Sequence, residues 1–189
     1  YDIVPDIMTL AKGIASSYIP FGAVAVSAEI NAPFESGETH FIHGFTNGGH
    51  PLGCAAGSEL IDIIRDENLL ENCRKQSEVL FSYREQLLAH PTVRDVRGWG
   101  LMMVLELIKD KESLDFFDSS LQAEKLYSAI TLKHGLVMYG SLYGPRRQAA
   151  FKRGLPSWIS PPLTISGEEM HDLVGRLDNA LSEWESIVL

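Results

Sequence analysis

The sequence is poor in cysteine, in basic residues and in long apolar runs, and each scarcity argues against a class of protein. Its two cysteines, Cys54 and Cys73, lie in apolar helical patterns and predict reduced core thiols rather than a disulfide framework. Acidic residues outnumber basic ones by 25 to 16, for a formal net charge of −9. This balance argues against a nucleic-acid or anionic-membrane surface. No apolar run approaches the length of a membrane span.

The chain begins at Tyr1, without an initiator methionine and without a basic segment followed by an apolar core. We therefore expect a cytoplasmic location and a chain that is one piece of a longer protein. Its composition, 45% hydrophobic and 22% charged, is that of an ordinary globular protein with a packed core.

The first part of the chain predicts a strand, a small-residue loop and a second strand. An apolar run from Ile7 to Ala11 is followed by the loop 12–17 and by a run from Ala23 to Val26. Residues 31–51, rich in Asn, Pro, Gly and His, predict a long loop that Phe34, Phe41 and Phe45 help to order. A helix then starts at Pro51, and its expected apolar face consists of Leu52, Ala55, Ala56, Leu60, Ile63 and Ile64.

The second part predicts a mixture of helices and short strands. The expected elements are helices over 69–90 and 121–134, a strand pair or one bent strand over 93–108, strands at 136–139 and 157–160, and a last helix after a capping box of Ser166 and Glu169. The last helix carries an apolar stripe of Met170, Leu173, Val174, Leu177, Leu181, Trp184 and Val188.

This order of elements predicts an α/β protein with two domains. Residues 1–65 form the C-terminal part of a large domain, at the edge of a mainly parallel sheet, together with a connecting helix. Residues 66–189 form a small C-terminal α+β domain.

Lys12 is the candidate catalytic residue. It directly follows the first predicted strand and is surrounded by small or apolar residues. A lysine amine becomes a nucleophile toward an aldehyde when desolvation or nearby positive charge lowers its pKa. We expect Lys12 to face a crevice that provides such conditions. A solvated lysine at a strand end is the plainer alternative, and local spacing alone favours it.

Several segments together resemble class III (omega) aminotransferases, which are fold-type I enzymes dependent on pyridoxal 5′-phosphate (PLP). The resemblance covers nearly the whole chain and preserves the order and spacing of its motifs. The motifs read PDIMTLAKG at 5–13, PFGA at 20–23, HGFTNGGHP at 43–51, CAA at 54–56, VRGWGLM at 96–102 and SPPLTI at 160–165.

The resemblance implies roles for three residues and a homodimer. Lys12 would be the Schiff-base lysine, and its freed amine would move the proton between substrate and cofactor. Thr46 would reach the PLP phosphate of the neighbouring subunit with its hydroxyl and backbone N–H, and Phe45 beside it is also assigned to cofactor binding. Residues 1–65 would then belong to the PLP-binding domain, and the active sites would be shared between two subunits.

Three histidines in the same loop, His40, His43 and His50, raise the alternative of a metal site. Their spacing does not match a zinc pattern, and no cysteine or carboxylate completes the set nearby. The family motif accounts for His43 and His50 without metal, so we expect none.

The substrate-binding region departs from the family pattern. Many relatives carry an arginine for the substrate carboxylate on the strand that Tyr139 occupies here. A basic insertion follows, in which Arg146 and Arg147 could bind a carboxylate or sulfonate instead. A solvated basic loop fits the same residues equally well.

The expected activity is transfer of an amino group from an amine or amino acid to a 2-oxo acid such as pyruvate. Family members supply the aspartate for the ring nitrogen, the aromatic that stacks on the ring and the phosphate loop before the lysine segment, so we expect this chain alone to bind PLP weakly. The alternatives are an aminomutase or decarboxylase on the same scaffold and a non-catalytic truncated paralogue or dimerisation fragment.

Overall fold

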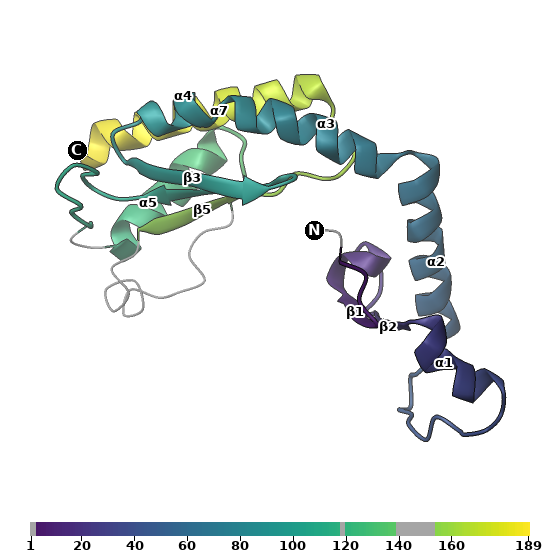
Figure 1. Ribbon diagram of the computed structural model, residues 1–189. Helices are drawn as coiled ribbons and strands as arrows, with labels where there is room; N and C mark the ends of the chain where they lie inside the picture. Colours follow the sequence, from purple (N-terminus) through teal and green to yellow (C-terminus); the bar gives the residue numbers. More distant parts are fainter. Residues whose placement is uncertain (1–2, 118–119, 139–153) are drawn as a thin grey trace. The chain divides into compact units, whose positions relative to one another are not determined.

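The computed structural model describes residues 3–117, 120–138 and 154–189 (Figure 1). The chain divides into two compact units, unit 1 (Tyr1–Asn68) and unit 2 (Leu69–Leu189). The boundary predicted from the sequence, between residues 65 and 66, lies at the end of the helix that precedes this division.

Unit 1 begins with an antiparallel hairpin. Strand β1 (Ile7–Ala11) pairs with β2 (Gly22–Val26), and a 3-10 helix, η1 (Lys12–Ala15), starts the connection between them. The predicted strand, loop and strand are therefore confirmed. The two strands are antiparallel because the connection is too short for the crossover that a parallel pair requires.

Helix α1 (Ala28–Glu35) shows that the loop predicted from residue 31 is wrong in its first part. The Ser27 side chain caps the helix by accepting a hydrogen bond from the backbone N–H of Ile30 at 3.4 Å. Glu29 lies in the first turn, where its negative charge interacts favourably with the positive end of the helix dipole. These start signals outweigh Pro33, which lies inside the helix.

Helix α2 (Pro51–Asp66) starts where the sequence predicts, with proline in the first turn. Its packed face differs from the prediction. The buried positions are Gly53 and Gly57, whereas Leu52 of the expected apolar face is 62% exposed. The helix therefore packs in unit 1 through small residues.

Unit 2 contains an antiparallel sheet of three strands in the order β3-β4-β5. The strands are β3 (Val93–Trp99), β4 (Met102–Leu107) and β5 (Leu155–Ile159). The first two confirm the predicted strand pair. The strand predicted at 136–139 is wrong over residues 136–138, which are in no strand; residue 139 lies outside the described residues.

The helices of unit 2 agree with the prediction except for one break. The predicted helix over 69–90 is two helices, α3 (Leu69–Ser82) and α4 (Arg84–Ala89), interrupted at Tyr83. Helix α5 (Ser120–Lys133) is followed by Gly135 at φ +77°, a left-handed conformation typical of helix ends. Helix α7 (Gly167–Val188) begins with the predicted capping box of Ser166 and Glu169.

The core of unit 2 lies between one face of the sheet and the helices (Figure 1). Alternate strand residues are buried, as in Met103, Leu105 and Leu107 of β4, while their neighbours are half-buried or exposed. From α7, the core receives Met170, Val174, Leu177, Leu181 and Trp184. These are five of the seven members of the predicted stripe; the other two, Leu173 and Val188, are partly buried against the core. Across the described segments, no helix combines the length and the apolar character needed to span a bilayer.

Candidate functional site

Lys12 stands at the point where β1 ends and the chain turns. Ala11 is still extended, with φ −157°, whereas Lys12 has φ +57°. Ser16 and Ser17 also have positive φ, +47° and +61°. Left-handed backbone is uncommon for residues other than glycine, and such conformations concentrate at functional sites. The connection that begins with Lys12 therefore contains three of the four non-glycine residues with positive φ in the described part of unit 1, the fourth being Asn68.

The Lys12 amine is exposed and uncommitted in unit 1. Within the described residues, it takes part in no hydrogen bond or ion pair. A methyl group added at Gly13 would meet nothing within 4 Å, so there is open space beside the lysine. The expectation of a crevice around Lys12 is not met by unit 1 itself. The reason is that its described part buries so little, namely Ala15, Gly53 and Gly57.

The turn after Lys12 is supported by the packing of Phe21 on α2. Gly53 and Gly57, one helical turn apart, form a flat strip under the Phe21 ring. A Cβ atom would lie 2.8 Å from the ring at Gly53 and 2.7 Å at Gly57. Only glycine allows this approach. The contact holds the end of the connection that begins at Lys12, and Ala15 within it is 1% exposed.

We expect Gly57→Val to weaken this support. The valine side chain would occupy the space of the Phe21 ring, and overpacking of this kind costs about 1–3 kcal/mol. Hydrogen exchange over residues 12–22 should then become faster. Ser58→Val is the matched control, because it places the same β-branched residue at the next, exposed position of α2. Equal exchange rates in the two variants would contradict the proposed support.

Thr46 lies in a tight turn of the segment between α1 and α2. The backbone N–H of Gly48 donates to the carbonyl of Phe45 at 2.9 Å, and Gly49 has φ +66°. Thr46 and Phe45 are both exposed. A short hydroxyl beside the N–H groups of a glycine turn is an arrangement that can bind a phosphate.

Aromatic side chains order the segment that carries this turn. The rings of Phe34 and Phe41 meet edge to face at 5.9 Å, Phe41 meets His43 at 5.8 Å, and His43 lies 6.4 Å from Phe45. These ring contacts are consistent with the prediction that the phenylalanines order the segment, although Phe34 itself belongs to α1. His43 is engaged by rings on both sides, and the described residues contain no group of three or more His, Cys, Asp or Glu side chains placed to hold a metal.

The remaining predicted residues divide into two groups. Tyr139, Arg146 and Arg147, the candidates for substrate binding, lie outside the described residues. Cys54 is exposed and Cys73 is partly buried. The prediction that both are core thiols is therefore wrong for Cys54.

Unit 2 contains a polar cluster that is not evident from the sequence. The sequence indicates His90 only as the end of a helix, yet its ring contacts Asp178 and Glu185 of α7. The available signal was the spacing of these two carboxylates, seven residues or two turns apart on a helix. Its partner could not be deduced from spacing alone.

Comparison with known proteins identifies the family. The aminotransferase class-III family matches residues 1–181. An aminotransferase of Gibberella zeae is 35% identical over 95% of this chain and 35% of its own length. A putrescine–pyruvate aminotransferase of Pseudomonas aeruginosa is 33% identical over 100% of this chain and 39% of its own length.

Solved structures agree with this assignment. An (S)-enantioselective omega-transaminase from Thermomicrobium roseum is 35% identical, with a TM-score of 0.79 over 97% of this chain and 38% of that one. The chain thus spans between a third and two fifths of the length of these relatives. They are fold-type I enzymes that depend on PLP. This chain belongs to the class III aminotransferase family.

Proposed function

We propose that the protein containing this chain transfers an amino group from an amine or amino acid to a 2-oxo acid, with PLP as cofactor and Lys12 as the residue that binds it. Unit 1 would be part of the PLP-binding large domain, and unit 2 would be the small domain. One observation carries the proposal: the amine of Lys12 is engaged in no ion pair within the described residues. Lys12 lies just after β1, has a left-handed backbone conformation and belongs to the segment that matches the family.

The described residues fit this cofactor. PLP carries an aldehyde, which needs an amine that is not engaged in an ion pair; Lys12 meets this one condition within the described residues, whereas unit 1 by itself does not provide the expected crevice. The open space at Gly13 leaves room beside the amine. When bound, PLP supplies an electron sink for the substrate carbon that loses its proton. Lys12 would anchor the cofactor and then hold and move that proton through its Nζ atom.

Thr46 and Phe45 extend the site to a second subunit. Thr46 would donate hydrogen bonds to the cofactor phosphate from its hydroxyl and backbone N–H, and the glycine turn would keep both groups in place. The exposure of Phe41 and Phe45, 70% and 71%, fits a segment that is covered by another copy of the chain. A homodimer with shared active sites follows from these roles.

The substrate is an amine or amino acid. Relatives include enzymes named for gamma-aminobutyrate and for putrescine with pyruvate, so the family accepts donors with and without a carboxylate. In this chain, Tyr139, Arg146 and Arg147 are the proposed substrate-binding residues, with the arginines available for an anionic group.

A reducing compartment suits the free thiols of Cys54 and Cys73, and we propose the cytoplasm. Relatives named as mitochondrial proteins occur as well. Location is therefore tested independently, by fractionation of cells that express the complete protein.

Mass spectrometry of the complete protein tests the cofactor role. The protein is incubated with PLP, treated with borohydride and digested. We expect one reduced cofactor per subunit, attached to Lys12, because an amine bound to an aldehyde is fixed by reduction. Label spread evenly over other exposed lysines such as Lys75, or no label at Lys12, would contradict the proposal and favour a non-catalytic lobe.

The reaction class is tested in the complete protein. Amino transfer to pyruvate supports the proposal. Release of carbon dioxide or an internal shift of the amine, without transfer, would instead identify a decarboxylase or an aminomutase on the same scaffold.

A further inference from the structure

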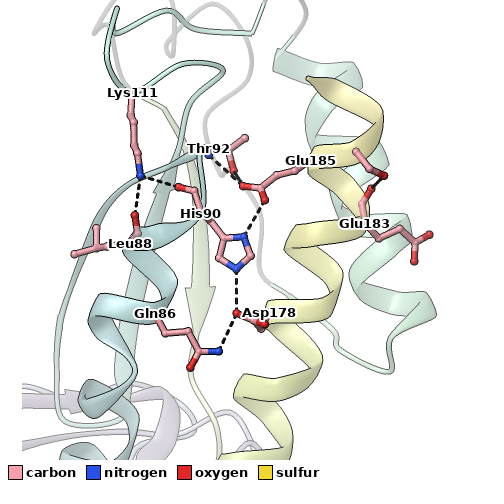
Figure 2. Close-up of polar contacts among 9 residues, drawn as sticks. Gln86, Leu88, His90, Thr92, Lys111, Asp178, Glu183 and Glu185 are labelled. Atoms are coloured by element: carbon pink, nitrogen blue, oxygen red, sulfur yellow. Dashed lines mark hydrogen bonds and ion pairs between the residues drawn. The ribbon is translucent and has the colours of Figure 1, made fainter.

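His90 of unit 2 is held between two carboxylates of α7 (Figure 2). Its Nδ1 atom lies 2.8 Å from Glu185 Oε2, and its Nε2 atom lies 3.0 Å from Asp178 Oδ1. The His90 side chain is 10% exposed and that of Glu185 is 9% exposed. This pair therefore sits almost out of water, while Asp178, at 32%, keeps some contact with it.

The hydrogen-bond partners fix the protons of this cluster. A neutral imidazole has one N–H donor and one bare nitrogen. Here both ring nitrogens face carboxylate oxygens, so a neutral ring would point a lone pair at one of them. Only the doubly protonated ring donates on both sides. Charge-assisted bonds of this kind are also stronger than neutral ones.

The two carboxylates also accept hydrogen bonds from other residues. Thr92 donates to Glu185 Oε1 from its hydroxyl at 2.6 Å and from its backbone N–H at 3.1 Å. Gln86 donates through its side-chain amide to Asp178 Oδ1 at 3.0 Å. Each of these donors favours the ionised carboxylate, and an ionised pair in turn requires a charged ring.

The cluster joins four parts of unit 2. His90 follows α4, Thr92 precedes β3, and the two carboxylates come from the C-terminal half of α7. Lys111, after β4, donates through Nζ to the carbonyls of Leu88 and His90 at 2.7 and 3.0 Å. These contacts fasten the α4–β3 corner to α7.

We propose that His90 is a doubly protonated clamp that fastens the C-terminal half of α7 to the α4–β3 corner, and that alkaline pH opens it. The inference is independent of Lys12 and of the proposed activity. The titratable groups that face His90 within the described residues are Asp178 and Glu185 on α7. Lys111 bonds its backbone carbonyl, while α4 and the start of β3 offer the neutral side chains of Gln86 and Thr92.

The direction of the pH effect follows from these contacts. The hydrogen bond to Glu185 is the main cause that raises the pKa of His90 above its usual 6.5, although burial opposes it. The clamp therefore contributes its full stability below about pH 6.5 and loses it as the pH rises through the raised pKa of the folded chain.

At low pH, Glu185 sets the other limit. Burial raises the pKa of its carboxyl group, but the hydrogen bonds from His90 and Thr92 outweigh burial and lower it below the usual 4.5. Its contribution is present above about pH 4.5 and is lost as the pH falls through the lowered value. The clamp is thus complete between about pH 4.5 and 6.5. It opens when the pH falls through the lowered pKa of Glu185 or rises through the raised pKa of His90.

The ring nitrogens of the 189-residue chain can be observed directly by ¹⁵N NMR. We expect the His90 ring to keep both nitrogens protonated to a higher pH than a free imidazole does, and this signal to disappear in His90→Gln. Asp178→Asn should move its titration to lower pH. His171→Gln is the control, since His171 is an exposed residue of the same helix bonded to Tyr83, and it should leave the signal unchanged.

Urea unfolding supplies the second readout. Wild type should exceed His90→Gln in its unfolding midpoint at pH 6, and the difference should shrink at pH 9.5. Each pH unit by which the folded pKa exceeds the unfolded one is about a tenfold change in the unfolding equilibrium constant. A neutral His90 ring in the folded chain at pH 6.5, or a titration at the pH of the exposed histidines, overturns the proposal. Should His90→Gln fail to fold, the wild-type and Asp178→Asn titrations decide it.

Discussion

Replacing Trp184 by alanine is expected to destabilise unit 2 by about 4 kcal/mol, in the range measured when a buried aromatic is truncated in a core. Trp184 is fully buried, and its ring lies 5.1 Å from Phe117 and 5.3 Å from Tyr127. Its indole N–H donates to the carbonyl of Ala123 at 3.1 Å. The substitution removes packing against α5 and leaves that carbonyl without its donor.

Urea unfolding followed by circular dichroism measures this loss. Trp184→Phe should cost less, because it retains an aromatic ring in the cluster and loses chiefly the hydrogen bond. Ile187→Ala is the control on the same helix: Ile187 is 57% exposed, and its truncation should change the stability by about 0.5 kcal/mol or less. A loss at Trp184 no larger than that at Ile187 would show that α7 does not pack as described.

The periodic spacing of apolar residues predicted the helices and strands that bury one regular face. The α7 stripe recurs every three or four residues, so its buried face could be read from the sequence together with the capping box of Ser166 and Glu169. Strand structure over 93–108, as a pair or as one bent strand, could be predicted from the apolar runs around Gly98 and Gly100; of these two glycines, only Gly100 lies in the turn between β3 and β4.

The packing of α2 could not be predicted because its contact positions are glycines, which have no side chain. Gly53 and Gly57 add nothing to a hydrophobic pattern, yet they are the positions against which Phe21 packs. The pattern pointed instead to the face that carries Leu52, which is exposed here. Close approach of a ring to a helix is fixed by tertiary structure, and a sequence records it only as two small residues one turn apart.

The candidate site is local in sequence, and this is why its residues could be proposed without a structure. Lys12 and Thr46 lie in short motifs that resemble those of the family. The His90 cluster is the opposite case, since its members are 88 and 95 residues apart in the chain. Only the folded unit brings an imidazole, two carboxylates and a threonine together.

Lys12→Ala, in the complete protein, is expected to lower kcat/KM for amino transfer to pyruvate by roughly 10²–10⁴-fold, the usual contribution of a positioned proton-transfer group. The physical reason is that Nζ would both hold the cofactor and move the proton, and alanine can do neither. Lys75→Ala, which removes an exposed lysine of α3, is the control and should leave the rate within about twofold of wild type, as expected for a surface substitution.

A small free amine separates a chemical role of Lys12 from a structural one. In Lys12→Ala, methylamine or ethylamine can enter the vacated space and take over part of the proton transfer, so the rate should rise with amine concentration. In Lys12→Arg, the guanidinium fills that space and stays protonated, because its pKa lies far above the working pH, so added amine should have no effect. Equal rescue of both variants, or of neither, would place the proton-transfer group elsewhere and leave Lys12 as a residue that only shapes the strand end.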